Sequence, residues 1–366
     1  MRIAILGSVA LPVPPPMQGG TEWIAYHQAK VLAARGHEVI LFAAKGSQPD
    51  SYQLVEVGGG DTVAGSHEFA RPRLANLQGE ALKESSRALR KETTYLADVS
   101  YKLIEHKDRF DVILNNMRGE TVFAPLAKLL GKKYATVLHL PLFKELAAFF
   151  KTYQTPLISI SNNQRKDFPD LNYLATVYNG VDTNRYAPIP YALGKRSDYY
   201  LLMMGTIGRH KNQGAAIAVA KKLGMKLVLA GKVRDEDYFL EISRDIDGKQ
   251  IVWKGELSFE EKLSLYQKAY AFIFPILWEE PFGLVMIEAM ACGTPVVAFG
   301  NGAIPEVVVD GKTGFVVENN DIGALIDSVS QIDKIDRSAC RKHVEENFSV
   351  EKMVSDYEKA LLALGV

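Results

Sequence analysis

This sequence has few cysteines, no long apolar run and no excess of either sign of charge. Cys292 and Cys340 are the two cysteines among 366 residues, and neither belongs to a Cys-x-x-Cys pair or a Cys/His cluster. Two thiols cannot build a disulfide framework and their spacing matches no zinc site, so we expect a reducing, cytoplasmic compartment. No run of 18 uncharged apolar residues occurs, and we therefore expect no membrane-spanning helix.

The two signs of charge are balanced, with 43 Lys and Arg against 43 Asp and Glu. A nucleic-acid partner usually requires a basic excess or a basic stripe that neutralises phosphates. Net charge gives no such argument here, and we expect no nucleic-acid partner.

The length and the apolar content fit two domains of ordinary size. With 47% apolar residues, a chain of 366 residues can bury two cores. Short apolar runs alternate with helical patterns in both halves, which is typical of parallel sheets covered by helices. We predict an α/β protein with two doubly wound, Rossmann-like domains facing a cleft, and a linker near residues 186–197.

The apolar runs and the turn-forming residues that bound them also predict individual helices and strands. Thr21 is expected to cap the first helix, and the polar, Gly-rich residues 48–66 are expected to form a loop. The predicted strands are 2–7, 36–43, 110–115, 134–139, 157–161, 199–204, 226–230, 271–274 and 295–299. The predicted helices are 21–34, 78–107, 213–223, 259–269, 283–291 and 349–364.

Two common nucleotide-binding fingerprints are absent from this chain. The dinucleotide pattern G-x-G-x-x-G should follow the first strand, but Gly7 is followed by Ser-Val-Ala-Leu-Pro, which removes the main support for a dehydrogenase. Gly311-Lys312-Thr313 resembles the end of a P-loop, yet Glu306 stands where its first glycine should be. An ATPase is therefore not favoured either.

The stretch 271–297, AFIFPILWEEPFGLVMIEAMACGTPVV, reads as strand, loop and helix. Glu280 falls in the loop and Glu288 lies within an almost wholly apolar helix, where a lone carboxylate should be rare unless something partners it. A helix N-terminus suits a phosphate, and carboxylates suit hydroxyl donors such as ribose or sugar groups. This combination suggests a sugar nucleotide as ligand.

The motif W-E-E-P-F-G-L-V-M-I-E-A-M-A-C-G-T-P-V-V resembles the E-x7-E signature of retaining glycosyltransferases of family 4, which have the two-domain GT-B fold. The resemblance extends to the glycine pair Gly19-Gly20, to T-V-Y-N-G-V-D at 176–182 and to P-E-V-V-V-D-G-K-T-G-F-V-V at 305–317. It implies an N-terminal acceptor-binding domain at 1–188, a C-terminal nucleotide-sugar-binding domain at 189–347 and a last helix, 348–366, packed back on the N-terminal domain.

The resemblance also implies a role for individual residues in transferring a sugar from a nucleoside diphosphate sugar to a hydroxyl acceptor. Glu288 should hold the ribose hydroxyls, Glu280 a hydroxyl of the donor sugar, and Lys211 the diphosphate. The residues expected to line the rest of the donor site are Gly19, Gly20, Pro281, Phe282, Gly283 and Leu284. No metal and no other cofactor is implied, and no D-x-D motif stands in a strand-end loop.

His139 ends a predicted strand, where polar side chains of an open α/β sheet face ligands. The family has a histidine at this point, beside the donor sugar.

One position departs from the family pattern. Gly205 is followed by Thr206 where the family has arginine, although Lys211 stands at the expected distance. Arg209 lies in the same loop and has the reach and the bidentate geometry to bind the diphosphate instead. We therefore count Arg209 among the expected donor-binding residues.

Three functions stay open at this point: a glycosyltransferase, a nucleotide-sugar epimerase of similar fold, and a binding protein without transfer activity. The acceptor of a transferase would be a saccharide, a lipid-linked molecule or a small molecule. Basic residues in 78–107 have two possible roles. They form a solvated helix face, or they attach the protein peripherally to the inner face of the membrane, because related enzymes often use lipid-linked acceptors. These residues are Lys83, Arg87, Arg90, Lys91 and Lys102.

Overall fold

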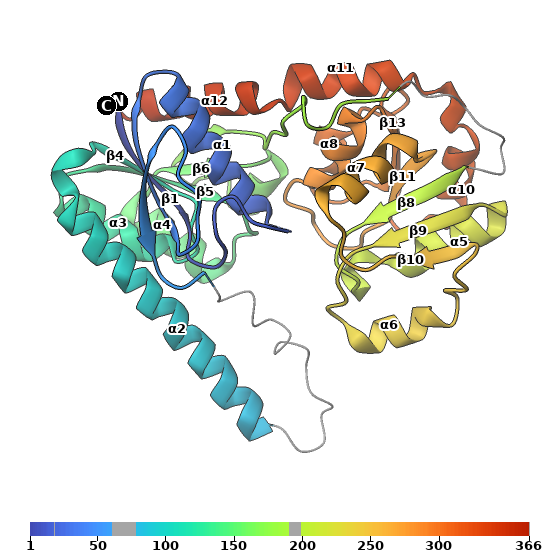
Figure 1. Cartoon of the computed structure of the whole chain (residues 1–366), viewed down its shortest axis with the longest axis horizontal. Coiled ribbons are helices and arrows are strands. Elements are labelled where there is room, and N and C mark those ends of the chain that lie inside the picture. Colours follow the sequence, from blue (N-terminus) through green and yellow to red (C-terminus); the bar gives the residue numbers. More distant parts are fainter. Residues whose placement is uncertain (18, 61–77, 190–198, 366) are drawn as a thin grey trace. The chain divides into compact units, whose positions relative to one another are not determined.

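A computed structural model describes residues 1–17, 19–60, 78–189 and 199–365. The chain forms two compact units (Figure 1). The first unit comprises Met1–Ile160, Gln164–Val177 and Met353–Val366, and the second comprises Ser161–Asn163 and Tyr178–Lys352. Most of the predicted linker at 186–197 falls on residues 190–198, which lie outside the described residues.

The first unit is built on a seven-stranded sheet of order β3-β2-β1-β4-β5-β6-β7, in which every neighbouring pair is parallel. Its inner strands are continuous apolar runs because helices cover both faces. The strand order reverses between β1 and β4, so the loops after these strands flank a switch point where ligands of such sheets bind. The strands are β1 (Arg2–Ser8), β2 (Glu38–Ala44), β3 (Gln53–Val57), β4 (Val112–Asn115), β5 (Lys133–Leu138), β6 (Leu157–Ser159) and β7 (Tyr173–Thr176).

The helices that accompany this sheet include α1 (Gly20–Ala34), α2 (Gln78–Glu105), α3 (Glu120–Leu129), α4 (Lys144–Tyr153) and α12 (Val350–Leu362). Helix α2 extends well beyond the sheet in Figure 1. In α12, Tyr357 and Leu361 are fully buried. Glu358 of the same helix accepts hydrogen bonds of 2.7 Å from Arg35 and His37, which follow α1. These contacts attach the last helix to the first unit.

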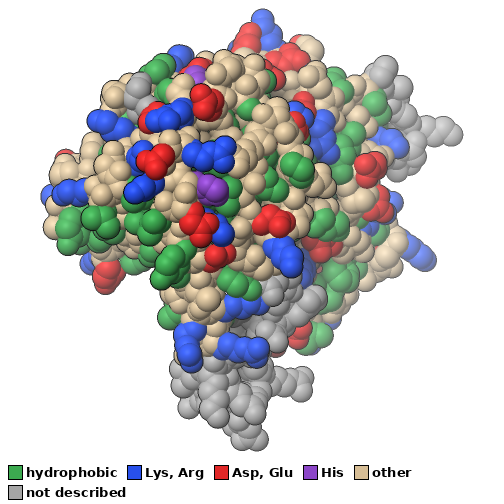
Figure 2. Space-filling model, turned by 60° about the vertical axis from the view of Figure 1, so that its left-hand side comes forward, with side chains coloured by type: hydrophobic (Ala, Val, Ile, Leu, Met, Phe, Trp, Pro, Cys, Tyr) green, Lys and Arg blue, Asp and Glu red, His purple; other side chains and the backbone are tan. Residues whose placement is uncertain are grey.

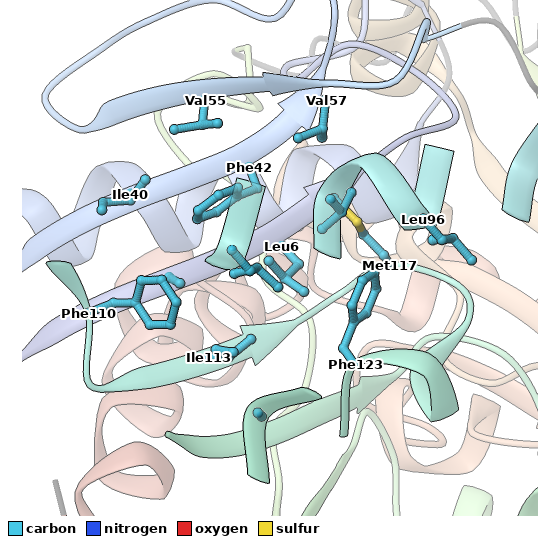
Figure 3. Packing of buried hydrophobic residues seen from close by; sticks show 14 of the residues in the cluster. Leu6, Ile40, Phe42, Val55, Val57, Leu96, Phe110, Ile113, Met117 and Phe123 are labelled. Carbon is cyan, nitrogen blue, oxygen red and sulfur yellow. The ribbon is translucent and has the colours of Figure 1, made fainter. Parts of the chain in front are cut away.

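One hydrophobic core cluster of the first unit lies between the sheet and the second half of α2, as Figure 3 shows. Side chains from β1, β2 and β4 meet those of α2 and α3 there, with Phe42 and Phe110 in an edge-to-face contact of 6.4 Å between ring centres. Burial of this apolar surface supplies most of the stabilisation of such a unit. The residues labelled in Figure 3 are Leu6, Ile40, Phe42, Val55, Val57, Leu96, Phe110, Ile113, Met117 and Phe123.

The second unit contains a six-stranded parallel sheet of order β10-β9-β8-β11-β12-β13. Its order reverses between β8 and β11, which again places two loops beside a switch point. The strands are β8 (Tyr200–Met204), β9 (Lys226–Ala230), β10 (Ile251–Trp253), β11 (Ala271–Phe274), β12 (Val296–Phe299) and β13 (Gly314–Val317). The helices are α5 (Gln213–Leu223), α6 (Glu236–Ser243), α7 (Phe259–Lys268), α8 (Leu284–Ala291), α9 (Ile304–Val307), α10 (Ile322–Ser330) and α11 (Arg337–Asn347).

Two local predictions are wrong. Residues 53–57, predicted within a loop, form β3, because Leu54, Val55 and Val57 are apolar side chains that suit a strand. Thr21 does not cap α1: the helix begins at Gly20, with Gly19 as its N-cap and no side-chain cap.

The surface agrees with the balanced composition. On the face shown in Figure 2, Lys and Arg side chains are interspersed with Asp and Glu side chains. No helix within the described ranges is both long enough and apolar enough to cross a membrane.

Candidate functional site

Lys211 and Glu280 form an ion pair at the carboxyl ends of two neighbouring strands of the second unit. Lys211 follows β8 and Glu280 follows β11, and these strands pair directly. The Lys211 Nζ lies 2.9 Å from Glu280 Oε2, and the two side chains are only 14% and 11% exposed. Trp278 donates a second hydrogen bond of 3.1 Å to the same oxygen. Both donors therefore bind the Oε2 oxygen of Glu280, and neither of them binds its second oxygen, Oε1.

Three loops fix the position of Glu280. The loop after β8 is tied to the loop after β11, because Leu277 N donates to His210 O at 2.9 Å. The loop after β12 holds the Glu280 backbone, whose carbonyl accepts from Ala303 N at 2.9 Å. A Cβ at Gly302 would stand 2.3 Å from both Glu280 N and Glu280 O, so only glycine allows this approach. The carboxylate thus sits on a rigid support.

The first turn of α8 begins directly after Glu280. Gly283 precedes the helix with a φ of +89°, a left-handed conformation that favours glycine. Pro281 and Phe282 lead into this turn, Phe282 is 2% exposed, and Leu284 is the first helical residue. The backbone N–H groups at such a helix start have no intrahelical partner and carry partial positive charge. An anion beside Lys211 would therefore meet favourable dipoles as well as a cation.

Glu288 on α8 is partnered by three donors that the sequence did not identify. Lys262 Nζ and Tyr186 Oη lie 2.9 and 2.7 Å from Glu288 Oε1, and Tyr266 Oη lies 2.8 Å from Glu288 Oε2. Burial and the nearby Glu288 raise the pKa of Tyr266 well above its ordinary value, so its hydroxyl stays protonated and donates. A carboxylate offers about four acceptor positions. One position of Glu288 is therefore left for another hydroxyl.

Arg209 points toward a different set of partners. Its guanidinium forms a bidentate pair with Glu241, in which Nη1 lies 2.8 Å from Glu241 Oε2 and Nη2 contacts Oε1. The Arg209 Nε also lies 3.8 Å from Asp235 Oδ2, and the Arg209 side chain is 56% exposed. The structure therefore brings Lys211 to Glu280 but turns Arg209 toward α6.

Gly19 and Gly20 lie in the first unit, where α1 begins. A Cβ at Gly19 would come within 2.8 Å of Glu22 Oε2 and 2.7 Å of Pro15, so a side chain does not fit there. Ser8, at the end of β1, donates a 2.7 Å hydrogen bond to Glu22 Oε1. Burial raises the pKa of Glu22. This buried contact fixes the start of α1 against the end of β1.

His139 follows β5 in the first unit, one position beyond the strand end. Its Nε2 lies 3.0 Å from Asn116 Oδ1. Asn116 directly follows the neighbouring strand β4, and the sequence analysis missed it. The signal that could have found it is the pair Asn115-Asn116 at the end of an apolar strand, the same signal that identified His139.

The expected site residues are thus divided between the units. Gly19, Gly20 and His139 belong to the first unit, and all the other expected residues belong to the second. Within the described ranges, no group of three or more His, Cys, Asp or Glu side chains is arranged to hold a metal ion.

Two family models match the chain. One, described as "Glycosyl transferases group 1", matches residues 191–347, and the other, "Glycosyltransferase Family 4", matches residues 18–185. Together they extend over both units.

Curated relatives and solved structures agree with these matches. Glycogen synthase of Mycobacterium tuberculosis strain H37Rv is 25% identical over 91% of this chain and 86% of its own length. The phosphatidyl-myo-inositol mannosyltransferase of Mycolicibacterium smegmatis is 25% identical over 94% and 89%. Anabaena HepE, solved with UDP and glucose, has a TM-score of 0.71 at 20% identity, with 99% of each chain covered. Sucrose-phosphate synthase from Thermosynechococcus elongatus has a TM-score of 0.72 at 20% identity, covering 99% of this chain and 98% of that one.

Proposed function

The chain belongs to glycosyltransferase family 4 and has the GT-B fold, and from this we propose that it transfers a sugar from a nucleoside diphosphate sugar to a hydroxyl acceptor with retention of the anomeric configuration. The observation that carries the proposal is the Lys211–Glu280 pair beside the first turn of α8. It combines a cation, helix N–H groups and a carboxylate, which suit a diphosphate and a sugar hydroxyl. HepE, which shares the fold, was solved with UDP-glucose.

The proposed roles of the residues follow from where negative charge develops during sugar transfer. When the bond between the sugar C1 and the diphosphate oxygen breaks, charge grows on the leaving oxygen, and Lys211 with the α8 N-terminus stabilises it. The acceptor oxygen bonds to C1 on the same face, and its proton passes to the leaving diphosphate. Glu280 orients the sugar through a hydroxyl, and Glu288 accepts from a ribose hydroxyl. The family resemblance further assigns Gly19, Gly20 and His139 of the first unit to contacts with the donor.

The test is an assay with UDP-, GDP- and ADP-sugars that measures nucleoside diphosphate release with and without hydroxyl acceptors. Transfer gives acceptor-dependent release and a new glycoside, whose anomeric configuration is determined by NMR. An epimerase would change the sugar without glycoside formation, and a binding protein would show affinity without either product. Either of those results would contradict the proposed sugar transfer. A product with inverted anomeric configuration would contradict the retaining mechanism.

Chelation is expected to leave the transfer rate unchanged. The proposed stabilisation of the leaving diphosphate uses Lys211 and backbone N–H groups, so it has no step that needs a divalent ion. The rate is measured before and after dialysis against excess chelator. A loss of activity that magnesium or manganese restores would contradict this prediction.

Arg209→Ala is expected to raise the dissociation constant of the donor roughly 10- to 150-fold, the range for hydrogen bonds to charged groups. This requires the guanidinium to leave Glu241 for the diphosphate, an exchange that costs little because exposed ion pairs contribute little to stability. The matched variant Glu241→Gln, which releases the guanidinium, should not weaken binding. If Arg209→Ala does not change donor affinity in calorimetry, Arg209 forms a surface ion pair and nothing more.

A further inference from the structure

His210 lies in the loop after β8, directly before Lys211, and contacts on two sides fix its position. Its backbone carbonyl accepts a hydrogen bond of 2.9 Å from Leu277 N in the loop after β11. Its imidazole packs edge-on against Trp278, with 5.8 Å between the ring centres, and the Lys211 Nζ lies 4.9 Å from the centre of the same Trp278 ring. The imidazole therefore lies beside the ion pair of the candidate site, whose carboxylate accepts from Trp278.

The imidazole of His210 is accessible to a ligand. His210 is exposed, and among the residues that the structure describes no group hydrogen-bonds to either of its ring nitrogens. His343 in the same unit differs, because its Nε2 donates to Val307 O at 3.1 Å and its Nδ1 lies 3.2 Å from Asn347 Nδ2. A ligand can bond to the His210 ring without breaking a contact inside the protein.

The fixed charges around His210 are balanced. The charged side chains that act on its ring, from the loops after β8, β11 and β9, are Lys211, Glu280, Arg234 and Asp235. Arg209, the preceding residue, is paired with Glu241. Two cations and two anions thus surround the ring, so a diphosphate would meet no excess of fixed positive charge there. Histidine is the one residue type whose ordinary titration near neutral pH can supply such a charge.

The charge of the His210 ring should depend on whether a diphosphate is bound. Partial removal of the ring from water lowers the pKa of His210, and the positive charge of Lys211 lowers it further. A bound anion acts in the opposite direction, because a negative charge within about 4 to 6 Å raises the pKa of an imidazole by about 1 to 3 units. At a pH between these two pKa values, the ring is neutral before binding and charged after it.

We propose that His210 is a second cationic group of the diphosphate site, which takes up a proton from solvent when a nucleotide sugar binds and donates a charged hydrogen bond from its imidazolium to a diphosphate oxygen. This inference rests on the proposed function, because it concerns the donor of the same reaction. The proton returns to solvent when the diphosphate leaves. Because the bound state holds the extra proton, donor affinity should rise as the pH falls from the pKa of the bound state toward that of the ligand-free state.

Calorimetric titration measures this proton. The probes are UDP-, GDP- and ADP-glucose, whose diphosphates are esterified at both ends and do not titrate near neutral pH. Titrations in buffers of low and high ionisation enthalpy give the proton uptake per donor bound. We expect roughly 0.5 to 1 proton at about pH 7, and an affinity roughly 5- to 20-fold higher at about pH 6.5 than at about pH 8.5, for a pKa shift of about 2 units. Binding with no proton uptake would overturn the proposal.

His210→Gln removes the titratable ring and keeps a hydrogen-bonding side chain. Because His210 is exposed, the variant should fold as wild type does, which thermal unfolding checks. We expect it to lose the proton uptake and the pH dependence, with an affinity near that of wild type at about pH 8.5 and roughly 5- to 20-fold weaker at about pH 6.5.

The control is His343→Gln. Burial also lowers the pKa of His343, but its ring bonds to groups within its own unit. This variant should keep the proton uptake of wild type. If His210→Gln keeps the uptake, or if His343→Gln loses it as His210→Gln does, His210 is not the group that takes up the proton and the proposal is wrong.

The same titrations, compared with the transfer assay, separate this inference from the proposed function. If a nucleotide sugar binds with proton uptake through His210 but no sugar is transferred, the proposed function fails and the role of His210 stands. If sugar is transferred without proton uptake, the role of His210 fails and the proposed function stands. If none of the three nucleotide sugars binds, both fail.

Discussion

Replacing Lys211 by methionine is expected to lower the rate of sugar transfer roughly 100- to 1000-fold, the usual effect of removing one group that stabilises a developing anion. The substitution removes the cation beside the α8 N-terminus, where the leaving diphosphate would gain charge. It also removes one of the two side-chain donors described above for the 11% exposed carboxylate of Glu280 and leaves Trp278, so Glu280 should hold the sugar less firmly. The rate is measured as nucleoside diphosphate release at saturating donor and acceptor.

The control is Lys221→Met, because Lys221 also forms an ion pair in the second unit, with Asp245, but both side chains are nearly half exposed. Exposed pairs of this kind contribute little to stability. This variant should transfer sugar at the wild-type rate. Circular dichroism and thermal unfolding of both variants separate a lost cation from a lost fold. A folded Lys211→Met protein that retains more than about a third of the wild-type rate would contradict the role of Lys211.

Glu288→Gln is expected to raise the dissociation constant of the nucleoside diphosphate by about 5- to 150-fold, which is about 1 to 3 kcal/mol. Three acceptor positions of Glu288 are taken by Tyr186, Lys262 and Tyr266, and the remaining one is available to a ribose hydroxyl. A glutamine has one oxygen in place of two, so it cannot serve all four donors. Calorimetric titration with the nucleoside diphosphate measures the change.

Lys262→Met separates the ribose contact from the internal contacts of Glu288. It removes the cation, which is 29% exposed, but leaves the carboxylate free to accept from ribose. Nucleotide affinity should therefore fall less in Lys262→Met than in Glu288→Gln. Glu260→Gln, an exposed change on α7, should have no effect. Equal losses in Lys262→Met and Glu288→Gln would mean that the network, and not a bond to ribose, accounts for the affinity.

The parallel sheets were predictable because their inner strands are unbroken apolar runs with clear ends. The runs 226–230 and 271–274 appear in the structure as β9 and β11 with the same bounds. Strand β10 was missed because Ile251–Trp253 is only three residues long, too short to show a period. Strand β3 was missed because the polar, glycine-rich residues around it favoured a loop.

The site was predictable only as far as its signals lie close together along the chain. The apolar surroundings of Glu288 indicated that it needs a partner, but Tyr186 lies 102 residues and Tyr266 lies 22 residues away. Which side chain crosses such a distance depends on tertiary packing, and no local pattern encodes it. Asn116 and His139 are separated by 23 residues, and the same limit applies to their contact.

Because the first unit is discontinuous along the chain, it can be completed only after the second unit has been synthesised. Met353–Val366, with the fully buried Tyr357 and Leu361, leave the ribosome only after Tyr178–Lys352. At about 5 to 20 residues per second, the intervening segment takes on the order of 10 to 35 seconds to make. Throughout that interval the nascent first unit lacks its last helix, and the apolar surface that will receive Tyr357 and Leu361 is open to chaperones.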